Sequence, residues 1–235
     1  MLYQCAATVK AKEEVAPCIY RFVFTLKDLS SISFTPGQYL LLQIPDGFRQ
    51  YSISSAPSDT ADIETIVDLT PMGVGSRYLL QLKLGDVVHF RAPAGIFTLK
   101  ENSNPKILLA TGTGITPLKS MLQHLAQQQP MPDSYLFWGL REKKDIYLTS
   151  VLNEISTRHP NFSYHICLSR EEANGEPHHF NGRMQECIIA QITPEMAMRA
   201  DWYLCGRPIV VEELVGFIQQ QYAVPKDRFF HEKYT

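Results

Sequence analysis

A run of glycines and threonines lies near the middle of the chain, between an apolar segment and an amphipathic one. It reads Thr111-Gly112-Thr113-Gly114-Ile115-Thr116-Pro117 and follows the apolar run Lys106 to Ala110. Glycines let the backbone approach an anion closely, and a helix N-terminus directs unpaired N–H groups at it. A glycine turn between a strand and a helix therefore predicts a pyrophosphate site. The third glycine of the usual dinucleotide fingerprint is absent, and Pro117 stands near the expected first helical position.

A second candidate segment, Arg49 to Ser55, carries a basic residue, an aromatic ring and hydroxyls on one short strand. Alternation along a strand places Arg49 and Tyr51 on one face, opposite to the residues between and after them. A guanidinium matches phosphate oxygens, and an aromatic face can stack on a flat ring. On spacing alone, an ordinary edge strand is the favoured interpretation of these residues.

A third segment, Met72-Gly73-Val74-Gly75-Ser76, lies at the start of a short expected helix. Its glycines and the helix N-terminus favour a second anion site. Ser76 would also suit a helix N-cap, so both interpretations stay open.

A fourth segment, Cys205-Gly206-Arg207-Pro208, follows the apolar run Trp202 to Leu204. This places Cys205 at the carboxyl edge of a predicted sheet, where α/β folds bind their ligands. A lone cysteine is more often a buried small apolar residue.

The last residues, Phe229 to Thr235, form an aromatic tail of the kind that is usually a docking segment or disordered. Further basic residues follow predicted strands: Arg141, the pair Ser169-Arg170, and Arg183 ahead of a helix. A 2′-phosphate requires positive charge and hydrogen-bond donors, whereas a bare ribose usually meets an acid. Glu171 and Glu172 follow at once, so the residues favour NADPH only by a small margin.

Short, mostly alternating apolar runs fill the chain up to about residue 100. They predict strands over residues 20–26, 39–44, 63–69 and 87–91, with one helix over 76–82. Such a pattern favours a small antiparallel Greek-key β-barrel.

After Asn102 to Pro105, which has the composition of a linker, the pattern changes. Strands are expected over 106–110, 134–138, 162–168 and 202–205, and helices between them. The first of these helices has an apolar stripe made by Leu118, Met121, Leu122 and Leu125. Alternating β and α elements predict a doubly wound parallel sheet. We therefore expect two domains, residues 1–102 and 103–235.

The composition argues against several classes of protein. The 235 residues carry a net charge of −2 and no block of like charges, which argues against nucleic-acid binding. The five cysteines lack metal-ligand spacing, so we expect no metal site or iron–sulfur cluster and a reducing compartment. No apolar run is long enough for a membrane span, and the N-terminus does not read as a signal peptide. We expect a cytoplasmic monomer that binds no membrane.

The order and spacing of these motifs resemble the ferredoxin–NADP reductase superfamily over essentially the whole chain. The resemblance implies that Arg49 binds the flavin pyrophosphate, that Tyr51 packs on the isoalloxazine ring and that Ser52 lies near flavin N5. It adds further flavin-binding positions: Ile53, Asp68, Leu69, Gly73, Val74, Gly75 and Ser76. FAD is expected rather than FMN, because a phosphate loop fits a pyrophosphate cofactor.

The same resemblance assigns the nicotinamide nucleotide to Thr111, Gly112, Thr113, Gly114, Thr116 and Pro117. Cys205, with Gly206 and Pro208, would lie beside the nicotinamide as a protonated thiol that positions it. Glu232 would assist proton and hydride transfer, and Tyr234 would cover the flavin. Ser169 and Arg170 resemble the NADPH-selecting pair of some family members, and Arg141 and Arg183 are added to them as nearby basic residues only.

The implied function is that of an FAD-dependent oxidoreductase. It would take hydride from NAD(P)H onto flavin N5 and pass electrons to ferredoxin, flavodoxin or an oxygenase component. Two alternatives remain: an NAD(P)H:flavin reductase that uses free, diffusible flavin as substrate, and a non-catalytic flavin-binding redox subunit.

Overall fold

The structure is a computed structural model that describes residues 2–59, 61–173 and 175–234. The chain divides into two compact units. The first unit contains residues 1–99 and 116–124, and the second contains residues 100–115 and 125–235. The domain boundary expected between residues 102 and 103 stays a prediction. Residues 116–124 lie after that boundary in the chain but group with the first unit.

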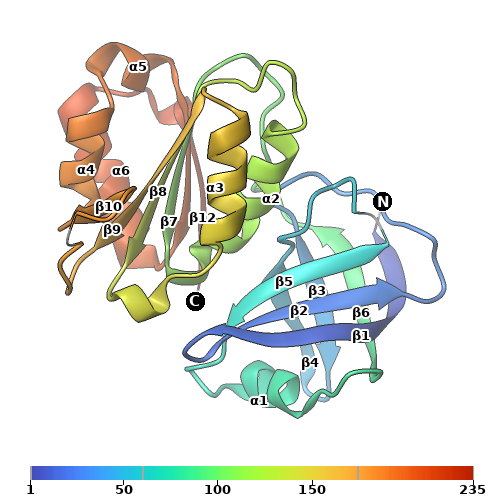
Figure 1. The fold of residues 1–235 in the computed structure, drawn as a ribbon. Coiled ribbons are helices and arrows are strands. Elements are labelled where there is room, and N and C mark those ends of the chain that lie inside the picture. Colours follow the sequence, from blue (N-terminus) through green and yellow to red (C-terminus); the bar gives the residue numbers. More distant parts are fainter. Residues whose placement is uncertain (1, 60, 174, 235) are drawn as a thin grey trace. The chain divides into compact units, whose positions relative to one another are not determined.

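The first unit is built on a six-stranded antiparallel sheet (Figure 1). Its strands are β1 (Tyr3–Ala16), β2 (Ile19–Leu26), β3 (Tyr39–Ile44), β4 (Gly47–Ser52), β5 (Asp62–Asp68) and β6 (Val87–Ala94), in the order β4-β3-β6-β1-β2-β5. The two edge strands are joined beyond the end of β4, where Ser54 N donates to Glu64 O at 2.8 Å. The sheet therefore closes on itself, which confirms the predicted antiparallel barrel.

Strand β1 has no counterpart among the predicted strands. Only its first half alternates clearly, with Cys5, Ala7 and Val9 pointing into the core. These inward residues are small, and the lysines and glutamates of the second half hide the pattern. Pairing with both β2 and β6 supplies the stability that the local sequence lacks.

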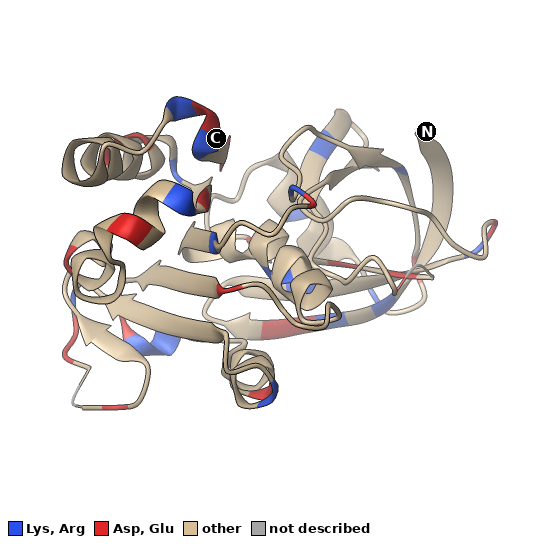
Figure 2. Cartoon of the chain, turned by 90° about the horizontal axis from the view of Figure 1, so that it is seen from above, with Lys and Arg blue, Asp and Glu red and all other residues tan. Residues whose placement is uncertain are grey.

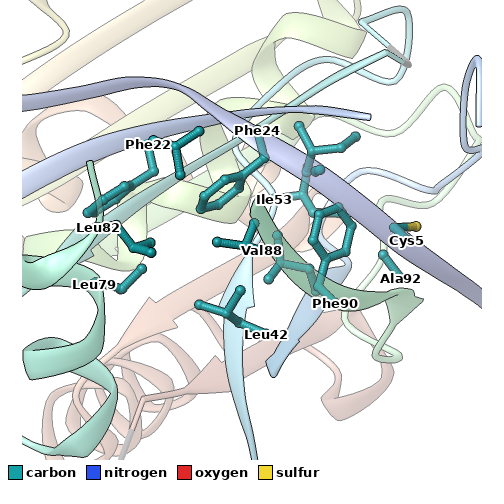
Figure 3. Close-up of a cluster of buried hydrophobic side chains, with 14 of the residues drawn as sticks. Cys5, Phe22, Phe24, Leu42, Ile53, Leu79, Leu82, Val88, Phe90 and Ala92 are labelled. Atoms are coloured by element: carbon teal, nitrogen blue, oxygen red, sulfur yellow. The ribbon is translucent and has the colours of Figure 1, made fainter. Parts of the chain in front are cut away.

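Aromatic and aliphatic side chains fill the barrel (Figure 3). Phe22, Phe24 and Phe90 are at most 2% exposed, and the rings of Phe22 and Phe24 stack with centroids 6.0 Å apart. Helix α1 (Val74–Gln81) contributes Leu79, with Leu82 directly after it, to the same core. Burying this face fixes the position of the helix, and hence of the glycines at its start.

The second unit is a six-stranded parallel sheet with helices. Its strands are β7 (Lys106–Thr111), β8 (Ser134–Leu140), β9 (Phe162–Leu168), β10 (His179–Asn181), β11 (Asp201–Gly206) and β12 (Phe229–Lys233), in the order β10-β9-β8-β7-β11-β12. The helices of this unit are α3 (Thr149–Arg158), α4 (Met184–Gln191), α5 (Pro194–Arg199) and α6 (Pro208–Tyr222), with 3₁₀ turns at Gly112–Gly114, Lys143–Asp145 and Lys226–Arg228. Helix α2 (Ile115–Leu125) follows β7 in the chain, but its residues 116–124 group with the first unit.

Helices cover both faces of this sheet. The apolar sides of α4 and α6 pack on Ile107, Leu109 and Trp202. Helix α3 lies on the opposite side of the sheet (Figure 1). This arrangement confirms the doubly wound parallel sheet predicted from the sequence.

The described part of the tail belongs to the sheet, although a tail of this composition is usually a docking segment or disordered. Residues 229–233 form β12, which pairs in parallel with β11. The rings of Phe230 and Tyr203 stack with centroids 5.0 Å apart, and Trp202 stacks on Phe229 at 6.4 Å. The tail aromatics are therefore part of the sheet and its packing.

A buried ion pair lies at the amino end of β7 and β11. Lys106 Nζ and Asp201 Oδ2 are 3.0 Å apart, with side chains 1% and 2% exposed. Asn102 Nδ2 and Arg228 Nη1 also donate to Asp201. Burial alone would raise the pKa of Asp201, but these donors outweigh burial and lower it. The network ties the segment before β7 to the sheet.

Charged residues are distributed over many elements, with both signs interspersed (Figure 2). Within the described ranges, no helix combines the length and the apolar character needed to cross a membrane.

Candidate functional site

The arginine strand and the first glycine loop meet in the first unit. On β4, Arg49 pairs with Leu42 and Tyr51 with Leu40, so both side chains are on the same face. A Cβ added at Gly75 would overlap the Tyr51 hydroxyl and lie 3.2 Å from Arg49 Cγ. Both side chains therefore lie against the start of α1, which confirms the face predicted by alternation. A side chain at position 75 would therefore displace the Tyr51 hydroxyl.

The N-terminus of α1 is open to an anion. The N-cap is Gly73, and no side chain among the described residues caps the helix. The interpretation of Ser76 as an N-cap is therefore wrong: the helix begins two residues earlier, because Gly73 supplies the extended backbone of a cap. The side chain of Arg77 instead holds the preceding turn, since its Nη1 donates to Met72 O at 2.6 Å.

The residues present fit the pyrophosphate of a flavin dinucleotide. Arg49 donates to Phe48 O at 2.9 Å and has no ion-pair partner within the described ranges. A cation without an ion-pair partner, beside an uncapped helix N-terminus and a glycine that leaves room for the Tyr51 hydroxyl, is a suitable cradle for phosphate. Burial raises the pKa of Tyr51, so its ring is presented as a neutral phenol.

Other predicted flavin residues have different roles in the structure. The side chains of Ile53 and Leu69 are in the barrel core, and their N–H groups donate to Gln38 O and Cys18 O. The Leu69 carbonyl in turn accepts from Met72 N at 3.2 Å, so both main-chain groups of Leu69 are already engaged. Val74 packs against the same core, and Asp68 accepts a hydrogen bond from Thr70 N at 2.8 Å. Ser52 is 6% exposed at the end of β4.

In the second unit, the glycine turn lies where the strand order reverses. The chain runs from β7 outward to β10 and then returns to place β11 on the other side of β7. Cys205 pairs with Ala110, so the turns after β7 and β11 are adjacent. Such a reversal is where open α/β sheets bind their ligands.

The two turns are packed too closely for side chains at their glycines. A Cβ at Gly114 would overlap the carbonyl of Cys205, and one at Gly206 would overlap Thr111 Oγ1. Gly112 is exposed with φ +53°, which glycine adopts at little cost. Gly114 therefore serves the packing of the turns, while Gly112 faces outward with space for an anion.

Sequence reasoning missed Trp138. Its side chain is fully buried, and its Nε1 donates to Gly112 O at 2.9 Å. Tyr147 packs edge-on against it, with centroids 4.8 Å apart. A tryptophan in an apolar strand gives no local signal of this role, because the contact depends on β8 pairing with β7.

The threonines and the proline of the turn are fixed by different contacts. Thr111 Oγ1 accepts a hydrogen bond from Arg207 N at 3.3 Å. Thr116 is 1% exposed, and its Oγ1 donates to Ile66 O at 3.0 Å. Pro117 is buried as the third residue of α2, because a 3₁₀ turn and two helical residues precede it. Thr113 is half-buried.

Cys205 lies between Ala110 of β7 and the C-terminal strand. It pairs with Glu232 across β11 and β12, and Tyr234 N donates to Gly206 O at 2.9 Å. Burial, and secondarily the charge of Glu232, raises the pKa of the Cys205 thiol, and a hydrogen bond with the Tyr234 side chain offsets this only in part. These effects favour the protonated form of the thiol. Pro208 begins α6 directly after this turn.

The loops after β8 and β9 bring two of the predicted arginines together. Arg170 N donates to Arg141 O at 3.0 Å, and Ser169 N donates to Leu140 O at 3.1 Å. Both arginine side chains are exposed, and Arg183 is exposed at the N-cap of α4. Glu171 accepts from Lys143 N at 2.7 Å, so this acid is engaged with the neighbouring loop.

Two protein-family descriptions match the chain. Residues 6–99 match the oxidoreductase FAD-binding domain, and residues 108–215 match the oxidoreductase NAD-binding domain. The chain is 34% identical over 213 residues to the toluate 1,2-dioxygenase electron transfer component of Pseudomonas putida. It is 31% identical over 211 residues to the anthranilate 1,2-dioxygenase electron transfer component of Acinetobacter baylyi. In both cases 88% of this chain is matched, and it spans 60% of the relative.

Solved structures share the architecture. A cytochrome P450 reductase from Amycolatopsis superposes with a TM-score of 0.89 at 27% identity, covering 100% of this chain and 70% of the other. A ferredoxin NADP⁺ reductase from Neisseria gonorrhoeae with bound FAD and NADP gives 0.80 at 20% identity, covering 98% of each chain, a likeness of fold. With matches to both domains along its length, the chain belongs to the ferredoxin–NADP reductase superfamily.

Proposed function

We propose that the chain is an NAD(P)H-dependent flavoprotein reductase that delivers electrons to a protein acceptor. The observation that carries the proposal is the meeting of Arg49 and Tyr51 with the bare Gly75 at the start of α1. A phosphate-binding cation, a ring for stacking and an open helix N-terminus converge there from two separate motifs. This is the set of groups that a flavin dinucleotide requires.

FAD bound at this site would supply the redox chemistry, accepting hydride from NAD(P)H and releasing electrons singly or in pairs. The chain would bind and orient it. Arg49 and the first-turn N–H groups of α1 would neutralise the pyrophosphate, and the Tyr51 ring would stack on the isoalloxazine. The Ser52 hydroxyl would hydrogen-bond near N5. FAD is favoured over FMN because this cradle suits two phosphates.

The turns after β7 and β11 would hold the nicotinamide nucleotide. The outward Gly112 and the start of α2 would receive the pyrophosphate, with Thr113, Thr116 and Pro117 shaping the turn. The neutral Cys205 thiol would pack beside the nicotinamide and position it. Glu232, in register with Cys205, would hold or accept a proton.

NADPH is proposed as the preferred donor. Arg141 and Arg170 lie on neighbouring loops without ion-pair partners in the described part of the chain, and Ser169 adds a hydroxyl. Arg183 would add charge at the start of α4. The pKa of Glu142 is lowered chiefly by Lys144 and also by the charges of Arg170 and Arg141, so a 2′-phosphate would share these two guanidiniums with that carboxylate.

The acceptor is proposed to be a protein. The relatives named above are electron transfer components of dioxygenases, and a further relative is the reductase component of a phenol 2-monooxygenase. An oxygenase component, a ferredoxin or a flavodoxin would each fit, since reduced flavin can release single electrons.

Anaerobic titration with NADH and NADPH in separate cuvettes tests the proposal. The purified chain should be yellow after desalting, and NADPH should bleach the flavin absorbance at a lower concentration than NADH. Colourless protein that acts only on added flavin would instead indicate a flavin reductase. Bound flavin that neither nucleotide bleaches would refute catalysis.

The flavin site is tested by Arg49→Ala. Loss of a charge-assisted phosphate contact should weaken FAD binding by about 10- to 100-fold. Arg91→Ala is the matched control, because Arg91 pairs with Leu41 on the opposite face of the sheet and lies over the Phe48 ring at 4.6 Å. Equal FAD affinity in the two variants would remove Arg49 from the site.

A further inference from the structure

We propose that the buried ion pair between Lys119 and Glu64 positions the end of β4, the strand that carries the proposed flavin-binding residues and is called the flavin-side strand below. It would fix Ser54 and, through it, the main chain at Ser52 and Ile53. This inference rests on the proposed FAD site. All of these residues belong to the first unit, which includes residues 116–124.

The pair lies where the barrel closes. Strands β4 and β5 are the two edges of the sheet. They are joined by the bond from Ser54 N to Glu64 O at 2.8 Å and by that from Glu64 N to Ser55 Oγ at 3.2 Å. Because this seam follows directly after Ser52 and Ile53, its geometry determines where the flavin-side strand ends.

Side chains reinforce the seam. Ser54 Oγ donates to Glu64 Oε1 at 2.6 Å, and Lys119 Nζ donates to the same oxygen at 2.7 Å and to Ser54 O at 3.1 Å. All three polar groups of Ser54 are therefore bonded. The Ile53 N–H donates to Gln38 O at 3.0 Å, so the segment is held from both directions.

The second oxygen of Glu64 and the third donor of Lys119 are also engaged. Arg21 Nε donates to Glu64 Oε2 at 2.6 Å, and Lys119 Nζ donates to Gln123 Oε1 at 3.2 Å. A fully bonded network of this kind is rigid and specifies one arrangement.

Burial makes a merely stabilising role a poor explanation. The Lys119 and Glu64 side chains are each 9% exposed, and Ser54 is 0% exposed. Desolvating two charges offsets most of their attraction, so apolar residues of similar volume often stabilise a fold as well as a buried pair does. What the pair adds is a defined position for Ser54, and small displacements near a reacting centre cost much of the rate.

The test compares two buried lysines. Lys119→Met breaks the ion pair with Glu64 at the seam. Lys106→Met breaks the ion pair with Asp201, in which the Lys106 and Asp201 side chains are 1% and 2% exposed. Each apoprotein is titrated with FAD, and amide hydrogen exchange is followed over residues 52–55. Urea unfolding records the loss of stability in each variant.

Lys119→Met should weaken FAD binding by at least about tenfold and speed exchange at residue 54, whereas Lys106→Met should lose stability with FAD affinity unchanged. Lys119→Arg, which keeps the charge, should restore part of the affinity. If Lys119→Met does not fold, Glu64→Gln gives the same comparison with a milder change.

Equal FAD affinity and equal exchange in Lys119→Met and Lys106→Met would overturn the inference. Failure of the proposed FAD site is distinguishable, because then the wild-type chain itself would bind no FAD.

Discussion

Replacing Gly114 by alanine tests the packing of the two turns that would hold the nucleotide. The added Cβ would overlap the carbonyl oxygen of Cys205 and lie 2.5 Å from its carbonyl carbon and 2.9 Å from Gly206 N. Carbon atoms in contact are normally about 3.5–4.0 Å apart, so one turn must move by about 1 Å. These are backbone atoms of a buried strand end and cannot rotate away. Overpacking of this kind costs about 1–3 kcal/mol, and we expect the upper part of that range.

The assay is urea unfolding of the apoprotein together with NADPH titration. Gly114→Ala should lose about 2–3 kcal/mol and, because the turn is displaced, bind NADPH at least about tenfold more weakly. Gly216→Ala is the control, since Gly216 lies within α6 with nothing within 4 Å of an added Cβ. Removing a helix-interior glycine should stabilise the chain by about 0.5–1 kcal/mol. Wild-type stability and NADPH affinity in Gly114→Ala would refute the close packing of the turns.

Three further predictions follow from the surroundings of single side chains. Cys205→Ser should lower the rate of flavin reduction in stopped-flow while leaving FAD affinity unchanged; equal rates would remove Cys205 from the site. Because burial raises the pKa of the Cys205 thiol, iodoacetamide at pH 8 should label only the exposed Cys18 in the native chain and all five cysteines after denaturation. Asp201→Asn should cost about 3 kcal/mol at pH 7, because Lys106 is left buried without its counter-charge. The pKa of Asp201 is lowered in the folded chain, so the stability that its carboxylate contributes is fully present above the ordinary pKa of about 3.9 and is lost as the pH falls through the lower folded value. The difference in unfolding free energy between wild type and Asp201→Asn, measured in urea, should therefore shrink over that pH range.

The sequence predicted the order and type of most elements because their apolar periodicity is local. The alternation of β4 correctly placed Arg49 beside Tyr51, and their contact with Gly75 agrees with it. The glycine turn after β7 and the cysteine turn after β11 were placed at strand ends from short apolar runs alone. In each case the relevant information lies within about ten residues.

Features that depend on distant pairing could not be predicted in this way. Strand β12 has an aromatic and charged sequence that is typical of an exposed tail, and only pairing with β11 makes it a strand. Trp138 supports Gly112 because β8 is the neighbour of β7. The Lys119–Glu64 pair joins residues 55 positions apart, and neither residue type is expected in a core.

The two kinds of glycine in the central turn show why a motif contains more than local chemistry. Gly112 has a backbone angle that favours glycine and faces outward, so its role follows from the turn itself. Gly114 must be bare because the carbonyl of Cys205, which is 91 positions further along the chain, occupies the space of its Cβ. The requirement at Gly114 therefore comes from the neighbouring strand, through the register that pairs Cys205 with Ala110. A sequence that keeps the first glycine and loses the second would retain an anion-binding turn but could not pack it beside β11. The spacing of the two glycines thus carries information about strand order that no single element contains.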